Sequence, residues 1–167
     1  RLNGTAASER YYPFSSVNLS LSPENTLVID APLVCDGVLQ TNDIARIYPD
    51  KGFIILGRKD NVINSGGIKI QAEEVEKLLR TFISVPFVIT SVPDQRLGQA
   101  VTLLIEGRAD TEEIENRLQT ILTPYYRPKY ILTTDCIPQT GNGKVNRAEC
   151  SDLAGKKLVT FLPSYPH

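Results

Sequence analysis

The sequence predicts an α+β protein in two parts: a β-rich piece over residues 1–59 and a small domain over residues 60–167. The small domain is expected to have a three-stranded core sheet, a β-hairpin and flanking helices. Two observations predict this class. Before Asp60, apolar and polar residues alternate and turn residues are frequent, as in antiparallel strands. After Asp60, strand patterns mix with apolar stripes at helical spacing, and the chain is long enough to bury a core.

Two hairpins are expected in the β-rich part. Residues 16–30 alternate apolar and polar side chains, with turn residues at 23–25 before a β-branched return strand. In the second hairpin, residues 44–48 pair with residues 53–56. The turn that joins them contains Gly52, which can take a positive φ.

The small domain begins with a tight hairpin over residues 62–70, whose turn is Ser65-Gly66-Gly67. Residues 86–92, 100–106 and 130–133 are rich in β-branched and apolar residues, and each is expected to form a strand. These three strands would form the core sheet.

Three helices are expected around this sheet. The first has polar pairs at i,i+4 on its wet side, Glu73 with Lys77 and Glu76 with Arg80. Its apolar face is formed by Val75, Leu78, Leu79 and Phe82.

The second helix begins at Asp110, because Glu113 three residues later completes a capping box. Its apolar stripe is formed by Ile114, Leu118, Ile121 and Leu122. A short last helix is expected to start at Asn146, with Glu149 in its first turn.

Composition excludes several functions. A formal net charge of −1 offers no electrostatic attraction for nucleic acid or an anionic membrane. No apolar run is long enough to span a bilayer. Cys35, Cys136 and Cys150 are far apart and the only histidine is His167, so no metal site is expected, and reduced thiols indicate a cytoplasmic protein.

Two motifs stand out. Residues 57–76 read GRKDNVINSGGIKIQAEEVE, and residues 138–147 read PQTGNGKVNR. In this order, with a small domain's length between them, they resemble the hinge region and the catalytic-lysine loop of the acyl-adenylate-forming superfamily. That superfamily includes acyl-CoA synthetases, luciferases and nonribosomal-peptide adenylation domains. With residues 10–14 and 41–45, the motifs are most similar to those of bacterial O-succinylbenzoate–CoA ligases of menaquinone biosynthesis.

The resemblance implies a fold and a reaction. The small domain would be the mobile C-terminal lid, and residues 1–59 the end of a large nucleotide-binding domain. A carboxylate would react with ATP to give acyl-AMP, and CoA would then displace AMP. Mg²⁺ would accompany ATP, with its ligands in the large N-terminal domain. The chain has no initiator Met, which suggests a part of a longer protein, and without the large domain it is expected to be inactive.

Lys144 is the candidate catalytic residue. It follows Gly141 and Gly143 in a polar segment that predicts an exposed loop. From spacing alone, a solvated surface lysine is the favoured interpretation, and a Walker-type phosphate loop is excluded because Val145 follows the lysine. The resemblance implies that Lys144 bridges the substrate carboxylate and the α-phosphate, where it would stabilise charge in the transition state.

Asp43 is the candidate ribose ligand. By resemblance, its carboxylate accepts hydrogen bonds from both ribose hydroxyls. The family usually has Gly before this Asp, whereas this chain has Asn42, which tolerates a left-handed turn. The alternative is an Asp that closes a turn before a strand.

Four further residues gain roles from the resemblance. Arg58 would contact the ribose or phosphate, and Asp60 would be the hinge whose φ and ψ absorb the domain rotation. Gly66 and Gly67 would line the passage for the pantetheine arm of CoA, since glycines let the backbone approach a ligand. A charged loop and an ordinary hairpin turn are the corresponding structural alternatives.

Two other functions stay open. The chain could belong to an adenylation domain that loads a carrier protein, or it could be a non-catalytic lid module that binds CoA or a partner. The residues that would select the acyl substrate lie outside this chain, and the sequence does not reveal the oligomeric state.

Overall fold

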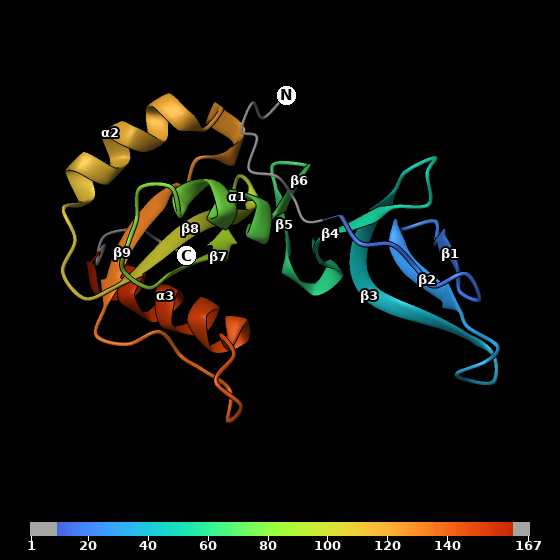
Figure 1. Cartoon of the computed structure of the whole chain (residues 1–167). Coiled ribbons are helices and arrows are strands. Elements are labelled where there is room, and N and C mark those ends of the chain that lie inside the picture. Colours follow the sequence, from blue (N-terminus) through green and yellow to red (C-terminus); the bar gives the residue numbers. More distant parts are fainter. Residues whose placement is uncertain (1–9, 162–167) are drawn as a thin grey trace. The chain divides into compact units, whose positions relative to one another are not determined.

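The computed structural model describes residues 10–161, which form two compact units with the boundary between Val62 and Ile63 (Figure 1). This boundary lies close to the expected one between residues 59 and 60. Predictions that fall on residues 1–9 and 162–167, including His167, lie outside the described residues.

The first unit is a four-stranded antiparallel sheet in the order β1-β2-β3-β4. Both expected hairpins are present, because β1 pairs with β2 and β3 pairs with β4. However, β3 begins at Val38 instead of Ile44, so the Asp43 region is strand and not turn. The strands are β1 (Asn18–Leu21), β2 (Thr26–Asp30), β3 (Val38–Ile47) and β4 (Phe53–Arg58).

The positive φ in the β3–β4 turn does not lie at Gly52, the residue that could most easily adopt it. Lys51 takes the left-handed conformation instead, with φ 64°. Its N–H donates to the Tyr48 carbonyl at 3.0 Å, and Asp50 Oδ1 accepts from the Gly52 N–H at 3.1 Å. A Cβ at residue 52 would lie 2.6 Å from Cδ of the exposed Arg10 side chain, which would have to shift.

The second unit is built around strands β7, β8 and β9, which form the expected three-stranded core. β7 pairs antiparallel with β8, and β9 runs parallel to β8. The β5–β6 hairpin joins the end of β8 where Ser65 lies opposite Gly98. The elements are β5 (Val62–Ser65), β6 (Ile68–Gln71), α1 (Ala72–Leu79), β7 (Phe87–Asp94), β8 (Gly98–Glu106), α2 (Thr111–Ile121), β9 (Tyr130–Thr134) and α3 (Arg147–Phe161). Single 3-10 turns lie at Lys59–Asn61 (η1) and Pro124–Tyr126 (η2).

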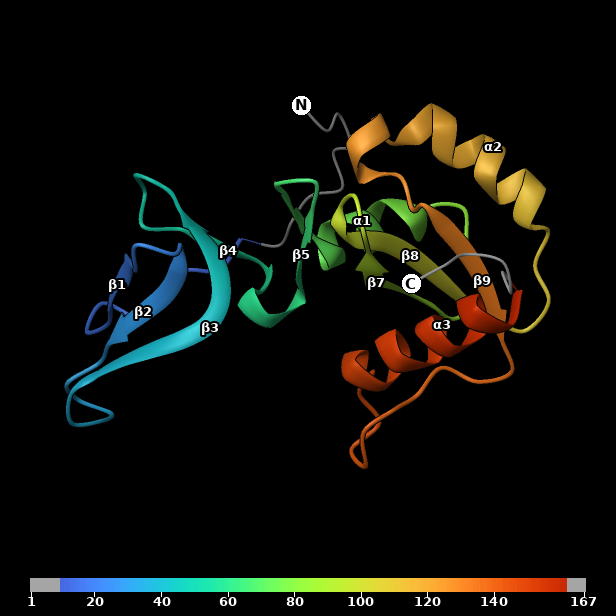
Figure 2. The ribbon, with the colours of Figure 1, turned by 180° about the vertical axis from the view of Figure 1, so that it is seen from behind.

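Both faces of this sheet are buried. Helices α1 and α2 cover one face and α3 covers the other, as Figure 2 shows from behind. The alternation of β8 divides its side chains between two apolar clusters. The first contains Val101, Leu103 and Ile105, as predicted, and the second contains Ala100 and Leu104.

The helix starts were predicted well, but the ends of the first and last helices were not. Asp110 Oδ1 accepts from the Glu113 N–H at 3.0 Å, and Asn146 Oδ1 accepts from the Glu149 N–H at 3.4 Å. α1 ends at Leu79, so Phe82 lies beyond it, although Phe82 still packs on the first cluster. The last helix is not short, since it has 15 residues. Over residues 10–161, no helix combines the length and the apolar character needed to cross a membrane.

Candidate functional site

Three of the predicted site residues lie together in the first unit. Asp43 on β3 is the register partner of Arg58 at the end of β4. Arg58 Nη1 lies 3.5 Å from Asp43 Oδ1, and Arg58 Nη2 donates to Asp60 Oδ2 at 3.3 Å. Asn42 Nδ2 also donates to Asp60 at 3.4 Å. The cluster is open to solvent, because the Arg58 side chain is 52% exposed.

The backbone around Asp43 is fixed by the sheet and not by a left-handed turn. A bulge lies between Ile44 and Ala45, next to Asp43, and such irregularities re-aim side chains. The Thr41 hydroxyl donates to the Leu27 carbonyl at 3.0 Å and accepts from the Asp43 N–H at 3.1 Å. An exposed carboxylate held in this way has two oxygens that can accept hydrogen bonds from a diol.

Asp60 lies in η1, the 3-10 turn that follows β4. This turn precedes the boundary between the two units, which falls after Val62. The Asp60 carboxylate is the acceptor that ties this turn to Asn42 on β3 and Arg58 on β4. No residue of η1 is buried.

In the second unit, Gly66 and Gly67 form the predicted turn between β5 and β6. Both have positive φ, 59° and 83°. The Gly66 N–H donates to the Leu97 carbonyl at 2.9 Å, and a Cβ on Gly66 would lie 3.3 Å from Leu97 Cδ2. A Cβ on Gly67 would meet no atom within 4 Å, so this position offers open backbone to a ligand.

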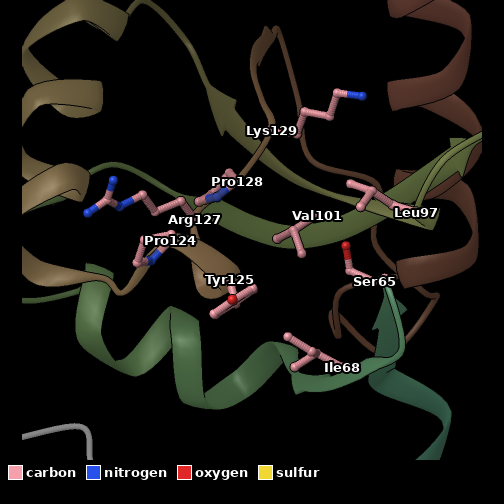
Figure 3. A pocket seen from close by; sticks show the side chains of 10 residues that line it. Ser65, Ile68, Leu97, Val101, Pro124, Tyr125, Arg127, Pro128 and Lys129 are labelled. Carbon is pink, nitrogen blue, oxygen red and sulfur yellow. The ribbon is translucent and has the colours of Figure 1, made fainter.

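A cavity of about 380 Å³ lies beside this turn. Figure 3 shows the Tyr125 ring facing the hollow, with Ser65 and Ile68 across from it. Sequence reasoning missed this cavity, because residues 124–128 were read only as a helix break. The available signal was the pair of tyrosines between Pro124 and Pro128.

Arg127 and Lys129 are among the residues that line the cavity, and Figure 3 shows their charged ends directed away from it. Arg127 Nε donates to the Leu122 carbonyl at 2.9 Å, and its Nη2 donates to the Gln119 carbonyl at 2.8 Å. Lys129 Nζ donates to Asp94 at 2.5 Å. This hydrogen bond raises the pKa of Lys129 and lowers the pKa of Asp94, whose carboxylate also accepts backbone N–H groups.

Lys144 lies in a closed turn just before the N-terminus of α3. The Thr140 N–H donates to the Lys144 carbonyl at 2.7 Å, and the Lys144 N–H donates to Thr140 Oγ1 at 3.2 Å. Gly143 takes φ 77°, and its N–H donates to the Thr140 carbonyl at 2.8 Å. Within residues 10–161, no hydrogen bond or ion pair engages the Lys144 ammonium group. The backbone is therefore ordered while the cation stays available.

The structure does not bring all the predicted residues together. In the second unit, the β5–β6 turn and the segment before α3 lie on different sides, and both views agree on this (Figures 1 and 2). Gly66 and Gly67 are thus separate from Lys144. Among the described residues, no group of His, Cys, Asp and Glu side chains could hold a metal ion.

One carboxylate differs from its sequence interpretation. Glu76 was expected to pair with Arg80 in solvent, but only 5% of it is exposed. It binds Arg147 instead, 71 residues away, through two hydrogen bonds of 2.9 Å.

Comparison with known proteins gives consistent relatives. No family model matches the chain. Triostin synthetase I of Streptomyces triostinicus is 36% identical over 71% of this chain and 24% of its own length. The 2-succinylbenzoate–CoA ligase of Lactococcus lactis is 32% identical over 66% of this chain and 25% of its own length. This chain therefore spans about a quarter of the length of these relatives.

Solved structures agree on the fold. E. coli MenE with bound OSB-AMS superposes with a TM-score of 0.69 over 87% of this chain and 35% of that one. The sequences are 22% identical. The mixed sheet-and-helix architecture described above is therefore shared with that structure.

Proposed function

Because the chain belongs to the acyl-adenylate-forming superfamily, and its length fits the C-terminal part of that family, we propose that it is the C-terminal part of an AMP-forming acid–thiol ligase. In the first half-reaction, a carboxylate oxygen attacks the α-phosphorus of ATP and pyrophosphate leaves. In the second, a thiol sulfur attacks the acyl carbon and AMP leaves. The observation that carries the proposal is Lys144, a cation on an ordered turn that has no partner among the described residues.

Lys144 suits the first half-reaction. Negative charge builds between the carboxylate and the α-phosphate as the new bond forms, and a held ammonium stabilises it. The backbone hydrogen bonds to Thr140 fix where the side chain starts, and the flexible stem lets the charge reach a site outside this unit.

The first-unit cluster suits the nucleotide. Asp43 would accept from the ribose hydroxyls, and Arg58 beside it would contact ribose or phosphate. Asp60 would be the hinge. Mg²⁺ would neutralise charge on the ATP phosphates, and we place its ligands outside this chain, in the large domain.

The β5–β6 turn and its cavity suit the second half-reaction. Gly67 leaves room for a narrow chain such as the pantetheine arm of CoA. Tyr125 offers a ring for stacking, and Arg127 beside it offers positive charge for phosphates. The sequence similarity to a 2-succinylbenzoate–CoA ligase supports that acid as the substrate. A cytoplasmic location, where ATP and CoA are available, is part of the proposal.

A second candidate is an adenylation domain that passes its acyl group to a carrier protein. The 36% identity to triostin synthetase I, whose name is not that of a CoA ligase, supports a thiol other than CoA. Both candidates share the first half-reaction and differ in the thiol, so they are separated by supplying CoA or a phosphopantetheinylated carrier. A non-catalytic lid module would catalyse neither step.

The test is pyrophosphate release by the full-length polypeptide that carries this chain, with a panel of acids that includes 2-succinylbenzoate. We expect Lys144→Ala to lower release by about 10²-fold or more, while transfer from supplied acyl-adenylate to the thiol changes little. Lys156→Ala, at an exposed position on α3, is the matched control. Normal release by Lys144→Ala would refute the assignment.

A further inference from the structure

A buried ion pair joins three elements of the second unit. Arg147 Nη1 and Nη2 donate to the two carboxylate oxygens of Glu76, each at 2.9 Å. Nη1 also donates to the Ile89 carbonyl at 2.8 Å, and the Ile89 N–H donates to Glu76 Oε1 at 2.9 Å. α1, β7 and α3 thus meet in one closed set of hydrogen bonds. The Glu76 side chain is 7% exposed and that of Arg147 is 22% exposed.

The position of this pair along the chain is informative. Arg147 is the first residue of α3 and follows Lys144 by three positions. Between them, the Asn146 N–H donates to the Pro138 carbonyl at 2.9 Å, which closes the base of the Lys144 turn. A bridge between Gln139 and Val145 completes the stem. The turn that carries Lys144 is therefore a short rigid unit whose base is attached at Arg147.

The geometry also explains why the residue is arginine. A guanidinium group is planar and donates two parallel N–H groups to a carboxylate, which fixes orientation as well as distance. A lysine ammonium would keep the charge but would act as a single point of contact. Burial favours a lower pKa for Arg147, but the hydrogen bond and charge of Glu76 outweigh it and raise this pKa, so the guanidinium stays ionised.

From these contacts we infer that Arg147 is a positioning residue for Lys144: its two-pronged bond to Glu76 sets the direction in which the Lys144 turn leaves the core. The inference rests on the proposed role of Lys144 in adenylation. A residue that only stabilised the fold would affect the whole unit equally, whereas a positioning residue affects the turn and the step that uses Lys144.

The first test does not depend on activity. We expect Arg147→Lys in the 167-residue chain to speed amide hydrogen exchange in residues 140–146 by roughly 10-fold. This change removes the fork, the two parallel hydrogen bonds from the guanidinium to Glu76, while it keeps the positive charge. Amides of β7 and β8 are expected to keep their protection. Arg117→Lys is the matched control, since Arg117 makes an exposed bond of 2.9 Å to Glu113 within α2. Exchange that is unchanged, or that rises equally across β7 and β8, would overturn the inference.

The second test uses the full-length polypeptide. We expect Arg147→Lys to slow adenylation by roughly 10- to 100-fold, as a misplaced catalytic group does, and to leave transfer from supplied acyl-adenylate within about 2-fold. Equal losses in both half-reactions would overturn the inference. If the wild type adenylates no acid, the proposed function fails, and the exchange result still decides whether Arg147 positions the turn.

Glu76→Gln provides an independent variant in case Arg147→Lys does not fold. It keeps the side-chain volume and one acceptor oxygen but removes the second arm of the fork. We expect the same local rise in exchange over residues 140–146 and the same selective loss of adenylation. A Glu76→Gln protein with a fully protected turn and normal adenylation would overturn the inference.

Discussion

Each unit contains an arginine that is paired with carboxylate groups, Asp43 and Asp60 for Arg58, and Glu76 and the more distant Glu73 for Arg147. The two clusters differ in burial and geometry. Arg58 in the first unit is 52% exposed and reaches its carboxylates at 3.3 Å and 3.5 Å. Arg147 in the second unit is 22% exposed and donates two hydrogen bonds of 2.9 Å to Glu76. The same residue types therefore have different roles in the two units. The buried fork holds elements together, while the open cluster leaves carboxylate and guanidinium surfaces accessible to a ligand.

The largest effect is expected where the buried fork is broken. Arg147→Leu would leave the Glu76 carboxylate inside the unit without its cation, and such breakage costs about 3–5 kcal/mol of unfolding free energy. Urea denaturation followed by circular dichroism measures this for the second unit. Replacing both Glu76 and Arg147 by Leu is the control, and we expect it to recover most of the loss. A cost for Arg147→Leu no larger than that for an exposed arginine would contradict the comparison.

Cys150 offers a local readout of the same change. It is buried, and burial raises the pKa of its thiol to about 11, so little thiolate forms at neutral pH. Cys35 and Cys136 are exposed and serve as internal references. We expect Arg147→Leu to speed alkylation of Cys150 through more frequent opening of the unit, with little change at the two exposed cysteines.

An intermediate effect is expected for the pair of Asp94 and Lys129. The Asp94 side chain is 7% exposed but that of Lys129 is 44% exposed, so water screens the interaction. Asp94→Asn keeps an acceptor for the N–H groups of Arg96 and Leu97 and removes the charge. We expect a loss of about 1 kcal/mol near neutral pH.

The pH dependence of this loss is specific. The pKa of Asp94 is lowered in the folded chain, chiefly by the hydrogen bond from Lys129. Stability from its ionised form is therefore complete above the unfolded value of about 3.9 and is lost as pH falls through the folded pKa. Denaturation curves of wild type and Asp94→Asn are expected to stay apart from about pH 5 to 8 and to converge in stronger acid. A difference that persists unchanged in strong acid would contradict this account.

The smallest effect on folding is expected in the first unit. Arg58→Leu removes an exposed cation from two carboxylates that water already solvates, so the loss is expected to be at most about 0.5 kcal/mol and to shrink in high salt. Urea denaturation at low and high ionic strength measures this loss of unfolding free energy. A loss as large as that of Arg147→Leu would show that the exposed cluster is structural and would remove the distinction between the units.

Local patterns predicted most of the fold. The alternation of β8, the capping of α2 by Asp110 and the Gly66-Gly67 turn are each decided by neighbours in the sequence, and each was found as predicted. The predictions failed where a distant partner decides. Glu76 has Arg80 one turn away, but burial against β7 and the guanidinium of Arg147 prevail.

In the candidate site too, features set by neighbouring residues were predicted and features set by distant segments were not. The short motifs identified every residue of the Asp43, Arg58 and Asp60 cluster, but the prediction of a turn at Asp43 was wrong because pairing with β2 and β4 extends β3. The cavity beside Gly66 draws on three separate segments, at residues 65–68, 97–101 and 124–129. Nothing in one segment's sequence specifies what the other two contribute, so only the folded chain reveals it.

The contact between Glu76 and Arg147 also has a consequence for the order of folding. β7 and β8 are neighbours in sequence and can pair early, whereas the ion pair closes a loop of 71 residues that includes the parallel crossover to β9. Contacts across such separations form late, because the entropy of closing the loop must be overcome first. During synthesis, a nascent chain that has not yet reached α3 therefore holds Glu76 without its cation. The segment with Lys144 is expected to become ordered only when the rest of the unit is already in place.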